Sequence, residues 1–168
     1  MDKKEFIIWF AGFFDGEGSI RVQRLSGENM RMKSPFFRLT IRVSNTNQEA
    51  IKLITTCLGG SMWETYSPPN KRSYNWQVSS ANAGNILEII EPYLIIKKAQ
   101  ALLAIKFQEG VNLNRGKYGG GPSRCLPQEL IEKRNQLRVE ISKLNKVGPR
   151  ARTVIRSKSS RGRYDSQL

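Results

Sequence analysis

The feature that most constrains this 168-residue sequence is an unbroken run of apolar and small side chains that leads straight into two acids. The run covers Ile7 to Phe14, and Asp15-Gly16-Glu17-Gly18 follows at once. A helix that is apolar on every side must be buried on every side, and this run is too short to cross a bilayer. We therefore expect one face of the helix to pack on its own domain and the other on a second copy of the same helix.

The position of the two acids indicates a cation. Carboxylates at the C-terminal end of a helix meet the negative end of its dipole, which is unfavourable unless a positive charge sits among them. The chain has no His, and its only thiols are those of Cys57 and Cys125. The available ligands are therefore oxygens, which suit a hard ion such as Mg²⁺.

The net charge of +14 indicates a polyanionic partner, with nucleic acid favoured. An anionic membrane surface is the weaker alternative, because no basic amphipathic helix with exposed Trp or Leu is present. The two cysteines lack the spacing of a zinc site or a disulfide framework. The N-terminus lacks a signal-peptide pattern. We expect an intracellular protein, in the cytoplasm or nucleoid of a prokaryote or in an organelle, and not a secreted one.

The order of the predicted elements is helix-strand-strand-helix, with the pattern then repeated. A capping box of Asp2 and Glu5 starts the first helix near Lys3, and one of Thr46 and Glu49 starts the second. The predicted strands are residues 19–25, 37–45, 61–67 and 72–80, and the third helix is 82–90. This order implies an α+β fold with a four-stranded antiparallel sheet backed by helices.

Beyond Pro92 the sequence predicts two more helices and a tail. The first helix runs to about Glu109, a Gly-rich surface loop covers 111–125, and Pro127 takes the first position of the last helix. We expect a folded domain over residues 1–145. Residues 146–168 contain seven Lys or Arg and one acid, and are expected to form a flexible basic tail.

The outward positions of the predicted strands carry polar side chains that suit nucleic acid. Arg pairs with guanine, Gln and Asn pair with adenine, and a two-stranded ribbon fits the DNA major groove but not that of RNA. Any half-exposed sheet shows a polar outer face, but the net charge favours DNA contact. The candidate DNA-binding residues are Arg21, Gln23, Arg38, Thr40, Arg42, Ser44, Arg72, Ser73, Asn75 and Gln77.

The segment Phe10-Ala11-Gly12-Phe13-Phe14-Asp15-Gly16-Glu17-Gly18 resembles the LAGLIDADG motif of homing endonucleases. The resemblance implies an αββαββα core whose sheet forms a saddle over double-stranded DNA. Because the motif occurs once, the resemblance implies a homodimer that cuts both strands of a long, near-palindromic site and leaves short 3′ overhangs. Such an enzyme is intron-encoded. The dimer interface is expected at Phe10, Ala11, Gly12 and Phe13.

The resemblance also assigns the site residues. Glu17 takes the position of the catalytic acid and metal ligand, and the carbonyl of Gly16 that of a second ligand. Mg²⁺ is the expected ion, with Mn²⁺ or Ca²⁺ as alternative occupants. Lys97 falls where an active-site lysine acts on the water or phosphate, with Lys98 as its alternative. Asn45 falls at a water-ordering position where the family often has Gln.

Other positions depart from the family or have a structural interpretation. Glu49 stands where related enzymes often have a basic residue, and Asp15 is expected to form local hydrogen bonds at the helix end. We expect Trp63 and Trp76 to pack in the sheet core or between subunits. Cys57 is expected to be buried on an apolar helix face.

Two other functions fit the same charge and fold. One is an RNA-binding intron maturase, with intron RNA as its partner, and the other is a non-catalytic, sequence-specific DNA-binding protein. Neither needs the acid at Glu17, so the presence of that residue favours the endonuclease.

Overall fold

The computed structural model describes residues 1–25, 33–66, 68–69, 71–119 and 125–145. The predicted basic tail, residues 146–168, lies outside this range. The elements are α1 (Lys3–Glu17), β1 (Gly18–Leu25), β2 (Phe36–Asn45), α2 (Gln48–Leu58), β3 (Ser61–Thr65), β4 (Ser73–Ser79), α3 (Ser80–Ile90), the 3₁₀ turn η2 (Glu91–Tyr93), α4 (Lys98–Asn112) and α5 (Gln128–Leu144).

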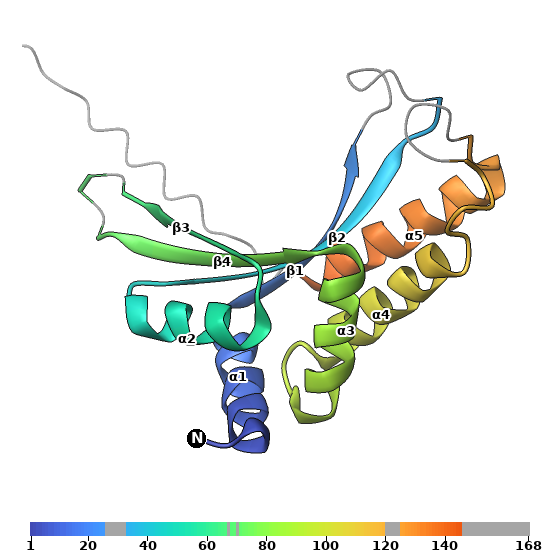
Figure 1. Cartoon of the computed structure of the whole chain (residues 1–168). Helices are drawn as coiled ribbons and strands as arrows, with labels where there is room; N and C mark the ends of the chain where they lie inside the picture. Colours follow the sequence, from blue (N-terminus) through green and yellow to red (C-terminus); the bar gives the residue numbers. More distant parts are fainter. Residues whose placement is uncertain (26–32, 67, 70, 120–124, 146–168) are drawn as a thin grey trace, which may run out of the picture.

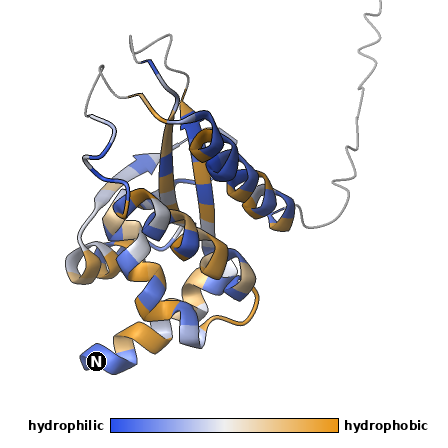
Figure 2. Ribbon diagram, turned by 90° about the vertical axis from the view of Figure 1, so that its right-hand side faces the viewer, coloured by the Kyte–Doolittle hydropathy of each residue, from blue (hydrophilic) through white to orange (hydrophobic). Residues whose placement is uncertain are grey.

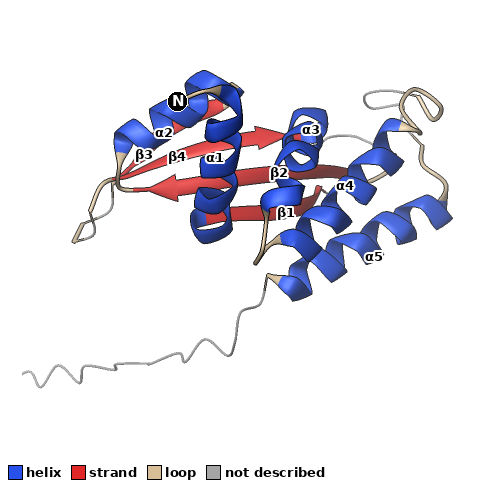
Figure 3. Ribbon diagram, turned by 90° about the horizontal axis from the view of Figure 1, so that it is seen from below, coloured by secondary structure: helices blue, strands red, loops and turns tan. Residues whose placement is uncertain are grey.

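The four strands form one antiparallel sheet in the order β1-β2-β4-β3. Seen from below, the helices lie across one face of this sheet (Figure 3). The helices of the described chain leave the opposite, curved face of the sheet uncovered (Figure 1). The α+β prediction and the four-stranded antiparallel sheet are therefore confirmed.

The core lies between the sheet and its helices because apolar and polar side chains alternate along the strands. Ile20, Leu39 and Ile41 are fully buried, whereas Arg21 and Arg38 are exposed. This alternation appears as orange and blue bands along the strands in Figure 2. None of the helices in the described part of the chain is long and apolar enough to span a bilayer.

Helix α1 begins as predicted. The Asp2 side chain accepts a hydrogen bond from the Glu5 amide, and the Glu5 side chain accepts one from the Asp2 amide, both at 2.8 Å. At its other end, a Cβ on Gly18 would collide with the backbone oxygen and ring of Phe14. Only glycine therefore lets the chain pass directly from the helix into β1.

Three predicted helix starts differ from the structure. The N-cap of α2 is Asn47, which accepts a hydrogen bond from the Ala50 amide at 3.1 Å, so the predicted capping box of Thr46 and Glu49 is wrong. Asn ranks above Thr as an N-cap. Helix α4 begins only at Lys98, after a non-helical segment. Pro127 is the N-cap of α5 and not its first helical residue.

Two further expectations are corrected. Helix α4 extends to Asn112 and shortens the predicted loop. Cys57 is exposed on α2, so its predicted burial is wrong.

Candidate functional site

The acid Asp15 joins the end of α1 to a distant segment of the chain. Its Oδ2 accepts hydrogen bonds from the amides of Ile95, at 2.6 Å, and Ile96, at 3.0 Å. Its Oδ1 accepts one from the amide of Lys97 at 2.9 Å. The partners are therefore some 80 residues away, and not local as expected. These bonds also explain why α4 starts late, because they hold residues 95–97 in a non-helical conformation.

The surroundings of Asp15 keep it ionised. Burial alone would raise the pKa of this carboxyl, but the hydrogen bonds from Ile95, Lys97 and Ile96 and the charge of Lys97 outweigh that effect. The net result is a pKa below the ordinary value of 3.8. Both oxygens already accept backbone hydrogen bonds, so Asp15 is engaged in holding the end of α1 to residues 95–97.

Glu17 has the opposite environment. Its side chain is exposed, and within the described residues no hydrogen bond or ion pair engages its carboxylate. Gly16, beside it, is also exposed. A free carboxylate and a backbone carbonyl are hard oxygen donors and fit Mg²⁺, which commonly takes one or two carboxylates and completes its shell with water and phosphate. The described part of one chain holds no cluster of three His, Cys, Asp or Glu side chains.

Lys97 lies at the same helix end. Its Nζ donates to the backbone oxygen of Asp15, two residues before Glu17. A cation at this end also complements the helix dipole. Lys98, the alternative, forms an ion pair with Glu91 at 3.4 Å. The structure therefore brings Lys97, and not Lys98, to the end of the motif helix.

Asn45 lies at the end of β2, near the junction of α1 and β1. The register pairs Gly18 with Val43, so Asn45 is two residues past the last β1–β2 pair. Its Oδ1 accepts a hydrogen bond from the Asn47 amide at 2.8 Å. Glu49 lies on α2 and pairs with Lys52 at 3.0 Å, so it is not held in a capping box.

The predicted dimer-interface residues separate into two groups. Phe10 and Ala11 are 1% and 0% exposed within a single chain, and the Phe10 ring meets Trp76 edge-on at 5.6 Å. Both belong to the protomer core, which corrects their assignment to the interface. Gly12 is exposed and Phe13 is half-buried. A Cβ on Gly12 would meet nothing within 4 Å, so α1 presents an open surface there.

The second candidate region is the helix-free face of the sheet. A polar hollow of about 240 Å³ lies on it. Its walls come from β1, β2 and β4 and are formed by Ser19, Arg21, Gln23, Thr40, Arg42, Ser44 and Gln77. Six of these seven were predicted as DNA-binding residues, and the structure gathers them on one surface.

Cross-strand pairs organise this face. Thr40 and Ser79 share a hydrogen bond of 3.2 Å, and the Ser44 hydroxyl donates to Asn75 Oδ1 at 2.7 Å. The Asn75 amide donates in turn to Thr65 Oγ1. Thr40 and Asn75 are only 7% and 6% exposed, so they hold the strands together and present little surface to a partner.

Arg72 does not belong to this face. It precedes β4 and forms an ion pair with Glu64 at 2.6 Å. Glu64 lies opposite Tyr74 in the β3–β4 register, and Tyr74 packs against the core. Arg72 is therefore on the helix side of the hairpin, which corrects its grouping with the outward residues. Ser73, opposite Thr65, remains on the outward side.

Trp63 lies on the outward face of the sheet and not in its core. It stands opposite Asn75 in the register, and the Arg42 guanidinium stacks over its ring at 4.9 Å. Trp76 is fully buried in the core, as predicted. Met62 and Trp63 are adjacent apolar residues in a five-residue strand, so only the register with β4 shows which of them points outward.

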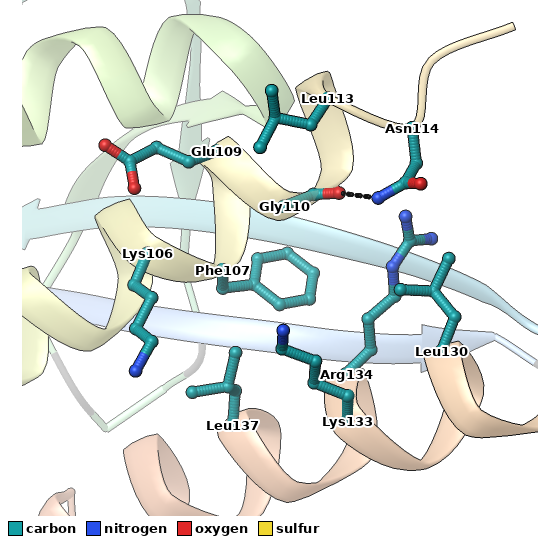
Figure 4. A pocket seen from close by; sticks show the side chains of 10 residues that line it. All are labelled: Lys106, Phe107, Glu109, Gly110, Leu113, Asn114, Leu130, Lys133, Arg134 and Leu137. Atoms are coloured by element: carbon teal, nitrogen blue, oxygen red, sulfur yellow. Dashed lines mark hydrogen bonds between the residues drawn. The ribbon is translucent and has the colours of Figure 1, made fainter. Parts of the chain in front are cut away.

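A second hollow, of about 260 Å³, lies between α4 and α5 (Figure 4). Phe107 and Leu137 form part of its apolar wall, and Lys106, Lys133 and the buried Arg134 add positive charge. It contains a single acid, Glu109, and none of the predicted site residues. It is therefore separate from the acidic end of α1.

The chain matches the LAGLIDADG endonuclease family over residues 10–107. A search of curated protein sequences gave no match. Among solved structures, the homing endonuclease I-CvuI, in complex with its target, has a TM-score of 0.67 and 22% identity, covering 88% of this chain and 85% of that one. The archaeal intron-encoded I-Vdi141I, complexed with DNA, has a TM-score of 0.68 and 19% identity, covering 89% and 90%. I-SmaMI, bound to cleaved DNA, has a TM-score of 0.62 and 20% identity, covering 78% of this chain but 42% of its own.

The fold and the motif helix with its terminal acids define a class of protein, the LAGLIDADG homing endonucleases, which are metal-dependent, site-specific DNA endonucleases. This chain belongs to the LAGLIDADG endonuclease family. It is similar in extent to the single-motif members I-CvuI and I-Vdi141I and to about half of the I-SmaMI chain.

Proposed function

We propose that two copies of this chain form a homodimer that hydrolyses both strands of a long, near-palindromic double-stranded DNA site. The observation that carries the proposal is the contrast between the two motif acids. Asp15 is fully engaged within the fold, whereas Glu17 is exposed and unengaged within the described residues, at the helix end that also holds Lys97.

Each residue at this helix end has a proposed role. The Glu17 carboxylate and the Gly16 carbonyl would hold a divalent ion, Mg²⁺ in the first instance, which when bound neutralises charge on the scissile phosphate. The Lys97 ammonium supplies a fixed cation that stabilises charge developing on the phosphate oxygens. Asn45 uses its Oδ1 within the fold, so its amide N–H groups are what remain to orient a water molecule.

The dimer is proposed because one chain offers one Glu17, and cutting two strands needs two such sites. The exposed stripe of α1 that contains Ile8, Gly12 and Gly16 is the contact surface we propose, in place of Phe10 and Ala11. Small residues let two helices approach closely. A two-fold symmetric protein recognises a site whose halves mirror that symmetry.

The helix-free sheet face is the proposed DNA-binding surface. Arg21, Gln23, Arg38 and Arg42 are exposed on it, and the chain carries a net charge of +14. The charge gives affinity for any duplex, and the base-edge contacts of these side chains would give the preference for one site.

The test is cleavage of a plasmid library that carries intron-insertion sequences from ribosomal RNA genes, in Mg²⁺. Wild type is expected to give discrete linear products. Glu17→Gln should bind the same plasmids in a mobility-shift assay but cut them at least about 100-fold more slowly. Glu132→Gln is the matched control, because it neutralises an exposed acid on α5 and should cut like wild type.

The other outcomes separate the alternatives. Specific binding by wild type without cutting would replace the endonuclease with a DNA-binding regulator. Preferential binding of intron RNA over all plasmids would favour a maturase. Equal cutting by wild type and Glu17→Gln would remove Glu17 from the site.

A further inference from the structure

We propose that Trp63 and Gln77 are positioning residues that fix Arg42 in place to read one guanine in each half-site. Arg42 thereby becomes a main specificity determinant of the central strands. The inference rests on the proposed function, because it assumes that the helix-free sheet face meets the DNA duplex.

The first support is that two neighbouring strands hold the Arg42 side chain. Its Nη2 donates to Gln77 Oε1 on β4 at 3.1 Å. Its guanidinium carbon lies 4.9 Å from the ring centroid of Trp63 on β3. The guanidinium thus reaches from β2 across β4 to the edge strand, with a hydrogen bond from one of its amino groups and an aromatic ring beside it. The Arg42 side chain is therefore restrained before any partner arrives.

The second support is the arrangement of the neighbouring pairs. In the β2–β4 register, Thr40–Ser79, Arg42–Gln77 and Ser44–Asn75 follow one another on the same face. In each of the outer two pairs, the two side chains form a hydrogen bond with each other. The middle pair differs, because Arg42 is exposed and a guanidinium has five N–H donors, of which Gln77 takes one.

The remaining donors fit guanine. In the major groove, guanine presents O6 and N7 as adjacent acceptors, and the planar fork of an arginine binds both at once. A side chain that is already held in place loses less conformational entropy on binding. Restraint by Trp63 and Gln77 therefore strengthens the contact and limits it to one orientation, so it favours guanine over bases that need another geometry.

The other arginines of this face are held less firmly. Arg38 stacks on Phe36 of its own strand at 5.5 Å. No hydrogen bond or ion pair engages the Arg21 side chain within the described residues, and it lies on the edge strand β1. Among the arginines of this face, Arg42 therefore combines an aromatic stack with a side-chain hydrogen bond within the described residues.

The experiment is selection of bound duplexes from a randomised DNA library in Ca²⁺, followed by sequencing, with wild type, Trp63→Leu, Trp63→Phe and Arg42→Lys. Wild type should select a G·C pair at one position of each half-site. Arg42→Lys should abolish that preference. Trp63→Leu should weaken it by roughly two- to fivefold, and Trp63→Phe should restore part of it. All other positions should keep their preferences.

Tyr66→Leu is the matched control. Arg72 stacks over the Tyr66 ring at 5.3 Å, so this variant removes a stack of the same kind at the end of the β3–β4 hairpin. It should leave every preference unchanged. Circular dichroism checks that each variant is folded, and Arg42→Lys, an exposed substitution, tests the assignment even if Trp63→Leu is unfolded.

The outcomes distinguish this inference from the proposed function. If wild type selects a defined site but Arg42→Lys, or a folded Trp63→Leu, leaves every position unchanged, the inference is overturned and the endonuclease stands. If wild type selects no sequence at all, the proposed function fails and this inference fails with it. Loss of preference spread evenly over all positions would also overturn it, because that pattern reports general weakening of the sheet.

Discussion

Asp15 and Glu17 show how two acids of one short motif acquire different roles from their surroundings. Asp15 faces the protein and accepts three backbone hydrogen bonds, while Glu17 faces outward at the same helix end. A carboxylate that accepts three amide hydrogen bonds stabilises the fold, whereas an exposed carboxylate is accessible to a metal ion and a phosphate. The difference arises because successive side chains along a helix point about 100° apart, so Asp15 and Glu17 face different surroundings.

The first residue-level prediction concerns Asp15 and pH. Because its pKa is lower in the folded chain than in the unfolded one, its contribution to stability is present above the unfolded value, near 3.8, and is lost as the pH falls toward the lower folded value. Asp15→Asn should lower the free energy of unfolding by about 2 kcal/mol at pH 7. The difference in the free energy of unfolding between wild type and Asp15→Asn should become smaller below about pH 4.

Urea denaturation at pH 7 and pH 3 measures both effects. Glu49→Gln serves as the control, since its exposed ion pair contributes little to stability. A wild type and an Asp15→Asn variant that keep the same gap at both pH values would contradict the assignment of an ionised, hydrogen-bonded Asp15.

The second residue-level prediction separates two adjacent lysines. Lys97→Met should lower kcat by about 100-fold, because a fixed cation next to the reacting phosphate is removed. Lys98→Met should stay within a few-fold of wild type, because the Lys98 ammonium is paired with Glu91 and not with the backbone of the motif helix. Single-turnover cleavage of the selected site measures both. Equal losses in the two variants would indicate a general electrostatic effect and not a role specific to Lys97.

At the scale of elements, the strands and their inward faces could be predicted from the sequence, whereas their register could not. Period-two alternation in β1 and β2 is a local signal, and it correctly predicts that Leu39 faces inward and Arg38 outward. The outward placement of Trp63 depends on pairing between strands, and the late start of α4 depends on Asp15. The motif marks Glu17 as a candidate, and the structure shows it exposed, whereas the hydrogen bonds of Asp15 could not be predicted because they join residues far apart in the chain.

The prediction at this scale concerns the open surface of α1. Gly12→Leu places a large side chain where a Cβ meets nothing in the protomer, so the single chain should fold with unchanged or improved helicity. The bulk should keep two α1 helices apart. Sedimentation velocity should then report monomer where wild type is dimeric. Ser142→Leu, an exposed position on α5, should leave the dimer intact, and a dimeric Gly12→Leu protein would rule out α1 as the contact surface.

At the scale of the whole molecule, the helices of the described chain cover one face of the sheet (Figure 3), and Arg21, Arg38 and Arg42 are exposed on the other. Core packing and the proposed DNA contact thus lie on opposite sides of four strands. Replacements on the outer face are expected to change the preferred DNA sequence at small cost to the core, because inward and outward side chains alternate along each strand.

The prediction at the scale of the whole molecule concerns residues 146–168, which contain seven Lys or Arg. If these cations bind phosphates, removing the segment should weaken DNA binding and lower the slope of log K against log salt by roughly 0.9 for each phosphate that is no longer neutralised. The selected sequence and the cleavage positions should not change, because phosphate binding carries no base information. Fluorescence anisotropy at several salt concentrations measures the slope. An altered sequence preference would instead assign base recognition to this segment.

The Asp15 bridge also has a consequence for the order of folding. It closes a loop of some 80 residues, and interactions of such long sequence separation form slowly because the entropy of closing the loop must be met first. Lys97 belongs to the segment that binds Asp15, so its ammonium reaches the end of α1 only when that loop has closed. A chain still emerging from the ribosome would hold the acid without its lysine. The hydrolytic role proposed for Glu17 and Lys97 would therefore be acquired only once residues 95–97 have docked on α1.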